Sequence, residues 1–420
     1  KPFGLKVSPP SPPAMYPLGP RRLVPTLLLL LCSTSGQWVE DQELRRQTDS
    51  RRPAAVKRVA VNLDLPPRER WAFLRDDPAF ANYRNNLIAY LKPFVPPLFL
   101  PLLAATVHSM QLTFYKDYAE EIRGVAQALG LSDGEAVLVN LVYQIEGAFA
   151  TDCTVKNTTG PCKQKGPGLC TGIVANGQGP ADMVWQGRNM DWNFPPNLLR
   201  YALQVDYTKN NATVFTGVQL AGMVGMLHGM KKGGFSVQLN ARDNGGKLFP
   251  NLFEEILRGG KTPTHAIRKA METMPDYASA EKFLASEHFA NPAYIIMAGA
   301  SHGEGAILSR GRQGAVDVWH MYEEPVKDSR RINEQPGWFR LQTNYDHWEA
   351  VPSWDDRRTP GVAHAREFLE HGVDEESVWK LMTAWPTKNF HTDITSVMCP
   401  QTGFVKTVAW MPPSEDVLVV

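Results

Sequence analysis

The sequence lacks several motifs by which enzyme sites are recognised. It has no G-x-x-x-x-G-K-[ST] phosphate loop, no G-x-G-x-x-G turn, no H-E-x-x-H pair and no C-x-x-C pair. Each of these motifs places groups that bind a phosphate, a dinucleotide or a zinc ion. Their absence argues against a nucleotide-dependent or zinc-dependent enzyme, and we expect no cofactor and no metal.

An excess of charge of one sign is also missing. The 420 residues include 44 Lys and Arg against 43 Asp and Glu, with 21% charged and 43% hydrophobic residues. This composition is typical of folded globular proteins and excludes disorder for most of the chain. Residues 1–60 hold ten of the basic and four of the acidic residues, which leaves 34 and 39 for the rest. We therefore expect no nucleic-acid partner for the folded part.

One apolar run lies near the beginning of the chain. After Met15, Arg21 and Arg22 precede Leu23–Cys32, which is too short to span a bilayer and is followed by small residues. This order is typical of a secretory signal peptide, and the alternative is a buried or disordered apolar run. The expected divisions are upstream sequence outside the fold at 1–14, the signal peptide at 15–36 and a polar linker at 37–57, with ordered structure starting near Arg58.

Export through the secretory pathway predicts a lysosomal or secreted protein. Two N-x-T sequons, at Asn157 and Asn211, fit glycosylation in that pathway. Of the five cysteines, four lie outside the leader, in an oxidising compartment where disulfides persist. Cys153 and Cys162, with eight residues between them, are expected to form a local disulfide.

Helical and strand-like patterns alternate along the rest of the chain. A strand is expected at Val59–Leu63, mostly helical structure from Pro78 to Gly147 with a capping box at Ser132 and Glu135, and an exposed loop at 152–168. The strands expected after this loop are 171–175, 183–186, 202–205, 213–220, 235–239, 293–298, 306–308, 315–319 and 339–342. Helices are expected within 252–285, 362–369 and 377–383. This order indicates an α+β fold with sheets between helices.

The segment Tyr90–Val107 is apolar at nearly every position and is broken by four prolines. It has two interpretations. It packs against the second half of the protein, or it forms a hairpin that enters an anionic membrane or vesicle surface.

Cys170 stands between the exposed loop and the first expected strand of the second half. The next strand ends at Gly187-Arg188-Asn189-Met190-Asp191, and the spacing predicts a hairpin that brings Arg188 and Asp191 close to Cys170. A thiol beside a guanidinium is shifted toward the thiolate, which is the nucleophile.

The chain resembles the acid ceramidase and N-acylethanolamine-hydrolysing acid amidase family of N-terminal nucleophile hydrolases. The resemblance rests on motifs from about Arg58 to about Asp393. Those in the second half are Cys170–Ala175, Gly187–Asp191, Gln342–Trp348 and Asp355–Thr359. Val61–Pro67, Glu121–Gly124 and Leu138–Tyr143 are similar to the family's smaller subunit.

The resemblance implies that the precursor cuts itself between Leu169 and Cys170. The products would be a mostly helical subunit, 58–169, and a catalytic subunit, 170–420, with an αββα sandwich, which remain together as an α/β heterodimer. The new α-amine of Cys170 would serve as the base for its own thiol, so that no catalytic His is needed. The implied substrates are lipid amides, either N-acylethanolamines or ceramide, hydrolysed to fatty acid and amine at acidic pH.

The resemblance also implies roles for further residues. Arg188 and Asp191 would orient the amine and thiol, and Arg357 would complete the polar end of the pocket. Asn344 would donate a hydrogen bond to the tetrahedral oxyanion. The remaining residues implied to contact substrate are Asn189, Tyr345 and Asp346.

One position departs from the family pattern. The family has a Glu before Arg242, where this chain has Ala241. This departure keeps a second hypothesis open, in which the chain is a non-catalytic lipid-binding relative. Cys153 is a second candidate nucleophile, but only Cys170 is followed by the strand and the Arg188 motif at a hairpin spacing.

Overall fold

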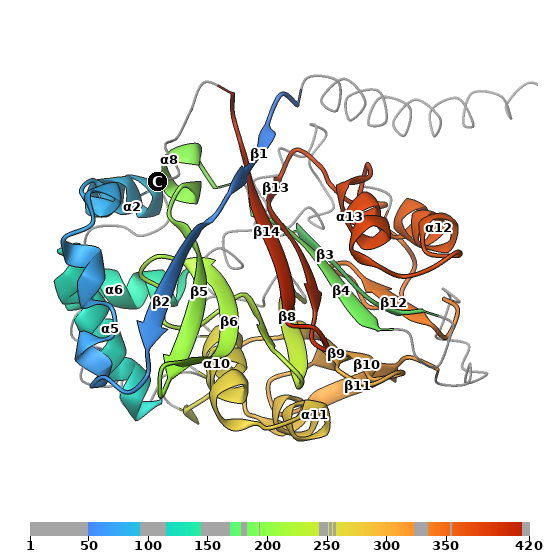
Figure 1. Ribbon diagram of the computed structural model, residues 1–420, viewed down its shortest axis with the longest axis horizontal. Helices are drawn as coiled ribbons and strands as arrows, with labels where there is room; N and C mark the ends of the chain where they lie inside the picture. The colour runs from blue at the N-terminus through green and yellow to red at the C-terminus, as the bar shows by residue number, and fades with distance from the viewer. Residues whose placement is uncertain are drawn as a thin grey trace, which may run out of the picture. The chain divides into compact units, whose positions relative to one another are not determined.

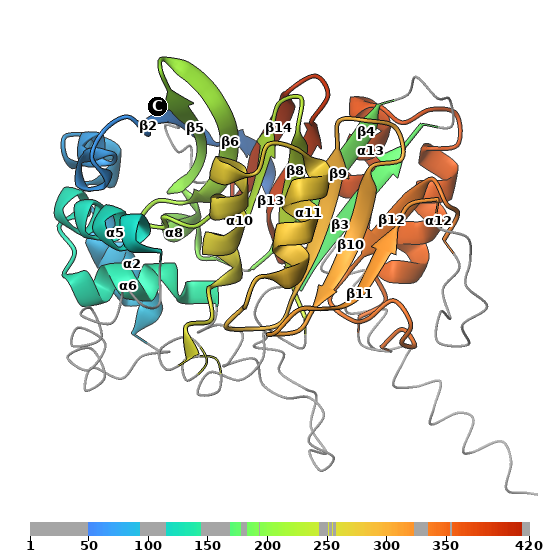
Figure 2. The ribbon, with the colours of Figure 1, turned by 90° about the horizontal axis from the view of Figure 1, so that it is seen from below.

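The computed structural model describes residues 49–92, 115–143, 169–177, 183–192, 194–242, 251, 254, 258–322, 335–352 and 355–413. Within these residues the chain forms two β-sheets that pack on each other, with helices on both outer faces (Figures 1 and 2). This is the expected α+β class. No described helix has the length and apolar character that a bilayer crossing requires.

The first sheet has six strands in the order β1-β14-β13-β4-β3-β12, and all neighbours are antiparallel. The strands are β1 (Arg52–Ala55), β3 (Leu169–Asn176), β4 (Val184–Asp191), β12 (Phe339–Gln342), β13 (Thr392–Cys399) and β14 (Phe404–Met411). The expected hairpin is present as β3 and β4, in which Cys170 lies opposite Met190 and Gly172 lies opposite Arg188. Cys170 therefore lies near the start of β3, the strand between β4 and the edge strand β12.

The second sheet has eight strands in the order β11-β10-β9-β8-β7-β6-β5-β2. The strands are β2 (Lys57–Asn62), β5 (Ala202–Lys209), β6 (Ala212–Leu220), β7 (His228–Lys231), β8 (Phe235–Ala241), β9 (Ala293–Gly299), β10 (Gly305–Arg310) and β11 (Ala315–His320). β2 is parallel to β5, and the other neighbours are antiparallel. Only Val56 separates β1 of the first sheet from β2 of the second.

Two pairs of helices cover the outer faces of the sheets. α12 (Arg358–Phe368) and α13 (Glu375–Thr383) pack on the six-stranded sheet, and α10 (Pro263–Thr273) and α11 (Tyr277–Ser286) pack on the eight-stranded one (Figure 2). At Gly187 of β4, an added Cβ would lie 2.6 Å from Met382 Cγ, so the missing side chain lets α13 approach.

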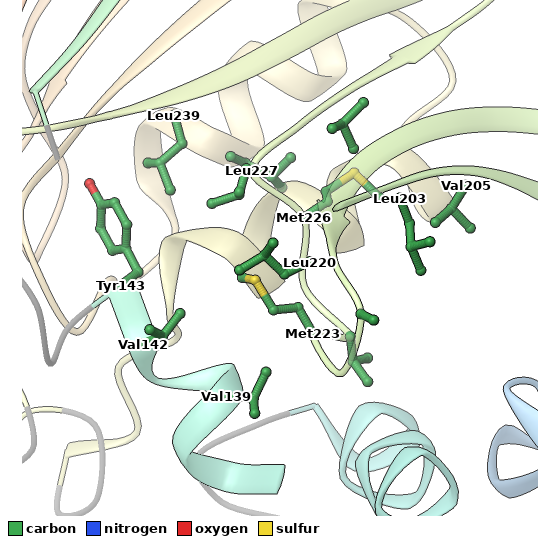
Figure 3. Packing of buried hydrophobic residues seen from close by; sticks show 14 of the residues in the cluster. Val139, Val142, Tyr143, Leu203, Val205, Leu220, Met223, Met226, Leu227 and Leu239 are labelled. Atoms are coloured by element: carbon green, nitrogen blue, oxygen red, sulfur yellow. The ribbon is translucent and has the colours of Figure 1, made fainter. Parts of the chain in front are cut away.

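The residues before Cys170 form mostly short helices. They are η1 (Pro67–Glu69), η2 (Ala72–Arg75), η3 (Pro78–Phe80), α2 (Tyr83–Leu91), α5 (Lys116–Leu129) and α6 (Asp133–Asn140), and α8 (Pro196–Leu199) packs on α2. The expected capping box is present, because Ser132 and Glu135 exchange hydrogen bonds at the start of α6. Figure 3 shows Val139, Val142 and Tyr143 facing a Leu- and Met-rich part of the buried core.

A buried ion pair joins the residues before Cys170 to those after it. Glu121 of α5 is fully buried and accepts hydrogen bonds from Trp71 Nε1 at 2.7 Å and from both Nη atoms of Arg268, on α10, at 3.3 Å. The Arg268 guanidinium lies 4.0 Å from the centre of the Tyr207 ring. The two halves of the chain therefore share one continuous core.

Some of the expected boundaries are wrong. Ordered structure begins before Arg58, because β1 lies within the expected linker 37–57 and pairs with β14. The pattern of apolar residues did not predict β1, because this strand is mostly exposed and is held by backbone pairing. The strands β7, β13 and β14 were also not expected. Most of Tyr90–Val107, the Cys153 and Cys162 pair and Asn157 lie outside the described residues.

Candidate active site

Cys170 lies at the second position of β3, with 4% of its surface exposed. Its backbone N–H donates to Asn344 Oδ1 at 2.6 Å, and its backbone carbonyl accepts from Arg357 Nη1 at 2.9 Å. Its thiol is 3.8 Å from Arg188 Nη2. The side chains of three residues that are distant in sequence therefore surround this one cysteine.

The Arg188 guanidinium is fully buried on β4. Besides the thiol, its Nη2 contacts the Leu239 carbonyl oxygen at 2.7 Å, and its Nη1 contacts His228 Nδ1 at 2.8 Å. Arg188 lowers the pKa of the Cys170 thiol, but burial raises it by more, so the pKa lies above its ordinary value. Arg188 therefore acts in the expected direction, toward the thiolate, but burial outweighs it in the uncut chain.

Asp191 ends β4 and is also fully buried. Its carboxylate accepts from Thr392 Oγ1 at 2.7 Å, from Asn389 Nδ2 at 2.8 Å and from Arg357 Nη1 at 3.3 Å. Burial raises the pKa of Asp191 to about 6, although Arg357 and the two hydrogen bonds lower it. Asp191 is thus a carboxyl that takes up a proton in mildly acidic solution.

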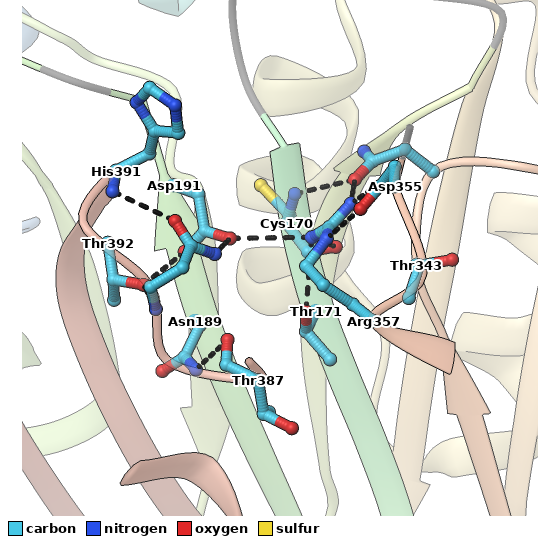
Figure 4. A network of polar contacts seen from close by, with 12 residues as sticks. Cys170, Thr171, Asn189, Asp191, Thr343, Asp355, Arg357, Thr387, His391 and Thr392 are labelled. Carbon is cyan, nitrogen blue, oxygen red and sulfur yellow. Dashed lines mark hydrogen bonds and ion pairs between the residues drawn. The ribbon is translucent and has the colours of Figure 1, made fainter. Parts of the chain in front are cut away.

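Arg357 connects the separate parts of the site. Figure 4 shows it between Asp191 on one side and Asp355 on the other, and two hydrogen bonds of 2.6 Å join it to Asp355. Its Nη2 also donates to Asn344 Oδ1 at 2.9 Å, and Asn344 Nδ2 donates to the Ala241 carbonyl at 2.9 Å. The Asn344 amide is therefore fixed with its oxygen toward the nitrogen of Cys170.

The structure does not bring the three residues implied to bind substrate into this site. Asn189 donates to the Met382 and Thr387 carbonyls at 2.7 and 2.8 Å and accepts from Thr395, which makes it a support for the α13 layer. Side chains alternate along β4, so Asn189 faces away from the sheet face that carries Arg188.

Tyr345 and Asp346 are occupied by structural contacts. The Tyr345 hydroxyl donates to the Asp355 carbonyl at 3.2 Å. Asp346 accepts two hydrogen bonds from Arg242, at 2.8 and 2.7 Å, and one from Tyr294 at 2.6 Å. These contacts position the loops around Arg357, and a role of either residue in binding substrate stays a prediction.

The sequence reading missed three neighbours of the site. Asp355 lies within a motif of the resemblance that implies no role for it, and the sequence predicts no role for His228 or Tyr143. Tyr143 is buried, and both burial and nearby Cys170 raise its pKa well above the ordinary value. Its hydroxyl has no hydrogen-bond partner among the described residues. A polar residue in an otherwise apolar run is a signal that could have marked His228 and Tyr143.

Other candidate groups lie outside this site. The sequence Gly299-Ala300-Ser301-His302-Gly303 matches a serine nucleophile motif, but Ser301 is exposed at the turn between β9 and β10 and not at a strand-to-helix elbow. Asn211 is exposed at the turn between β5 and β6. Among the described residues there is no group of three His, Cys, Asp or Glu side chains that could hold a metal ion.

Comparisons with known proteins identify relatives of the chain. No protein-family model matches the chain. The N-acylethanolamine-hydrolyzing acid amidase of Rattus norvegicus is 29% identical, over 88% of this chain and 91% of the relative. A solved structure of the Caenorhabditis elegans ortholog of that amidase is 29% identical, covers 55% of this chain and 93% of its own, and has a TM-score of 0.47.

Acid ceramidases are similarly related. That of Heterocephalus glaber is 31% identical, over 80% of this chain and 82% of the relative, and that of Homo sapiens is 30% identical, over 82% and 83%. Such identity over most of both chains shows common descent. The chain therefore belongs to the family of hydrolases that contains acid ceramidase and N-acylethanolamine-hydrolyzing acid amidase.

Proposed function

We propose that the chain cleaves itself between Leu169 and Cys170 and then hydrolyses lipid amides, N-acylethanolamines or ceramide, to fatty acid and amine at acidic pH. The observation that carries the proposal is the surroundings of Cys170. Its thiol faces a guanidinium, and side chains rather than neighbouring strands hold its backbone N–H and C=O. A cysteine with only a packing role has no need of these contacts.

The cleavage begins with the thiol of Cys170 and the carbonyl carbon of Leu169. The S–C bond forms, the C–N bond to Cys170 breaks, and the nitrogen takes the thiol proton. Water then hydrolyses the thioester, which leaves a carboxylate on Leu169 and a free thiol and α-amine on Cys170. Asn344 and Arg357 hold both sides of the Cys170 backbone during these steps.

The amidase reaction uses the released amine as the base. It takes the proton of the thiol, the thiolate attacks the amide carbon of the substrate, and the ammonium returns the proton to the leaving amine. Water then hydrolyses the acyl thioester and releases the fatty acid. An α-amine has a pKa of about 7.7–8.0 in solution. Burial and the nearby Arg188 and Arg357 would lower that value, which suits a base that works in acid.

The raised pKa of Asp191 also supports activity at acidic pH. A negative carboxylate close to the amine would raise the pKa of the amine, but below about pH 6 Asp191 is neutral. Asn344 would stabilise the oxyanion through its amide nitrogen, one N–H of which donates to the Ala241 carbonyl. Loss of one such donor costs about 2.7–4 kcal/mol in the barrier.

The proposal includes the organisation of the mature protein. The layers of helix, sheet, sheet and helix are those of an N-terminal nucleophile hydrolase, and the mostly helical part before Cys170 would be the smaller subunit of a heterodimer. Glu121 and Arg268, fully buried on opposite sides of the cut, would hold the subunits together. We assign the protein to the lysosome or the secreted fraction, with glycans at Asn157 and Asn211.

Mass measurement of the purified protein tests the cleavage. After incubation at acidic pH the wild type should yield one fragment that ends at Leu169 and one that starts at Cys170, while Cys170→Ala stays intact. Cys399→Ala is the matched control, because Cys399 is the other described free cysteine and is buried away from Arg188. An active protein with any other N-terminus would refute the mechanism, and an intact, inactive wild type would favour the lipid-binding alternative.

Release of fatty acid tests the substrate class. The cut protein should release it from an N-acylethanolamine or from ceramide in mild acid, and Asn344→Ala should lower kcat by roughly 10²–10³-fold. The control for this variant is Asn291→Ala, a buried asparagine whose one side-chain hydrogen bond among the described residues is to the carbonyl of Pro292. Hydrolysis of neither lipid by a cut, folded protein would contradict the proposal.

A further part of the proposal concerns delivery of the substrate. The Tyr90–Val107 segment would contact an anionic membrane, so that a fatty amide does not cross water as a monomer. Anionic vesicles should then raise activity on long-chain amides more than on a short-chain amide. Leu98→Asp with Leu100→Asp should remove that difference, and an unchanged preference and unchanged vesicle binding would contradict it.

A further inference from the structure

His228 lies at the start of β7 and is fully buried between the two sheets. Its Nδ1 is 2.8 Å from Arg188 Nη1, and its Nε2 is 2.8 Å from Ser396 Oγ. A guanidinium only donates hydrogen bonds, so Nδ1 must be the acceptor. The imidazole proton is then on Nε2, where it donates to Ser396. His228 is a neutral ring that joins Arg188, on β4, to the neighbouring strand β13.

Neutrality of His228 follows from its surroundings. Burial and the positive charge of Arg188 lower its pKa well below the ordinary value. Among the described elements packed around it, β8 presents Gln238 opposite His228, and β13 presents Ser396. The charged or titratable groups nearest to it are Arg188 and, beyond Arg188, Cys170, Asp191 and Tyr143.

The partners of Arg188 differ from those of two other buried arginines, Arg357 and Arg268. Arg357 pairs with Asp355 and Arg268 pairs with Glu121, so that a carboxylate balances each of those charges. The Nη atoms of Arg188 instead meet an imidazole, the Leu239 carbonyl and the Cys170 thiol. Two neutral acceptors fix its orientation without cancelling its charge.

We propose that His228 is a positioning residue: it holds the Arg188 guanidinium against the Cys170 sulfur through a neutral acceptor and leaves the full positive charge to stabilise the thiolate. The inference rests on the proposed function, in which Cys170 is the nucleophile. His228 is not itself a base in this scheme, since its Nδ1 is occupied by Arg188 and its Nε2 by Ser396.

The hydrogen bond from His228 to Ser396 makes the arrangement rigid. Ser396 Oγ lies 3.0 Å from Thr407 Oγ1 on β14, so the contact continues across the six-stranded sheet. β7 belongs to the eight-stranded sheet, and the ring therefore joins the two sheets beside the site. A rigid acceptor at this place keeps Arg188 in one orientation, which a flexible side chain would do less well.

Three substitutions of His228 separate the effect of its charge on Arg188 from the effect of its hydrogen-bond acceptor. His228→Gln retains a neutral acceptor and an N–H donor, His228→Glu puts a carboxylate beside Arg188, and His228→Leu removes the acceptor. The thiol pKa is measured from the ultraviolet absorbance of the thiolate as a function of pH, with Cys170→Ala subtracted. We expect a thiol pKa near that of the wild type in the Gln variant and a higher one in both the Glu and the Leu variant.

Kinetics on the cut enzyme give the second measurement. His228→Leu should lower kcat by roughly 10²-fold, because a displaced Arg188 no longer faces the sulfur, while KM changes little. His228→Gln should restore most of that loss. The matched control is His265→Gln, a buried histidine held by Thr262 away from the site, which should alter stability and leave the thiol pKa unchanged.

The outcomes distinguish this inference from the proposed function. The thiolate measurement needs neither self-cleavage nor hydrolysis of a lipid, so it can fail while the proposed function stands. Equal thiol pKa values in the Gln and Glu variants would overturn the inference. If His228→Leu does not fold, the comparison of these two variants, which have side chains of similar shape, is sufficient for the test. A fall in kcat that follows only the loss of stability in each variant would also overturn it.

Discussion

Replacement of Asp191 by Asn should remove a pH dependence that this carboxyl gives to the stability of the fold. Burial raises the pKa of Asp191 from 3.8 to about 6. Between these values the folded chain keeps a proton that the unfolded chain has released. The contribution to stability is fully present below pH 3.8 and is lost as the pH rises through about 6. The difference between the two pKa values corresponds to about 3 kcal/mol.

The measurement compares Cys170→Ala with Cys170→Ala combined with Asp191→Asn, because the first substitution keeps the chain uncut. Urea unfolding is followed by Trp fluorescence from about pH 3.5 to about pH 7. The free energy of unfolding should fall across this range by about 3 kcal/mol more in the single variant than in the double variant. Asp393, a second buried carboxyl with a raised pKa, is present in both proteins. Parallel pH dependences would refute the reasoning, since Asp191 would then titrate alike in folded and unfolded chains.

Three further substitutions test other parts of the structure. Arg357→Lys retains the charge but not the paired hydrogen bonds to Asp355, and steady-state kinetics should show kcat lower by roughly 10²-fold; an unchanged kcat would remove Arg357 from the site. Gly124→Ala should lower the free energy of unfolding in urea by about 2 kcal/mol, because its Cβ would lie 2.2 Å from a backbone carbonyl oxygen of η1, and wild-type stability would contradict that contact. Arg268→Met removes one ionic partner of the buried Glu121 carboxylate and leaves Arg70, so it should cost about 2 kcal/mol, and gel filtration of the cut protein should show the two fragments separating if the pair with Arg268 holds them.

Local patterns in the sequence predicted much of the fold. β3, β8 and β9 contain β-branched or aromatic residues and are bounded by turns, and the capping box marked α6. β13 was harder to recognise, because it is buried along its whole length yet contains Thr, Ser and Asp, whose polar groups are satisfied by partners far along the chain. Such long-range partners cannot be read from the spacing of apolar residues.

In the candidate site, too, local contacts were predicted from the sequence and long-range contacts were not. The proximity of Cys170 to Arg188 followed from a hairpin, which is a local structure. The contacts of Asn344 and Arg357 with Cys170 join residues more than 170 positions apart, and only the resemblance to a family suggested them. The roles in substrate binding that the resemblance implies for Asn189 and Asp346 stay predictions, and in the structure both side chains make supporting contacts. His228 is a single polar residue in an apolar run, but its contact with Arg188 joins strands of different sheets, which no local pattern predicts.

The single residue between β1 and β2 has a consequence for assembly. The stretch before Cys170 supplies an outermost strand to each sheet, with Val56 as the step between them. After a cut at Leu169–Cys170, that stretch would still pair with an edge of each sheet but would no longer be covalently linked to the catalytic fragment. While the chain is whole, the tether supplies a high effective concentration for this docking. After the cut, the two unfolded fragments would have to meet by diffusion. The protein would therefore assemble efficiently as an uncut precursor, and the cut protein would refold poorly after denaturation.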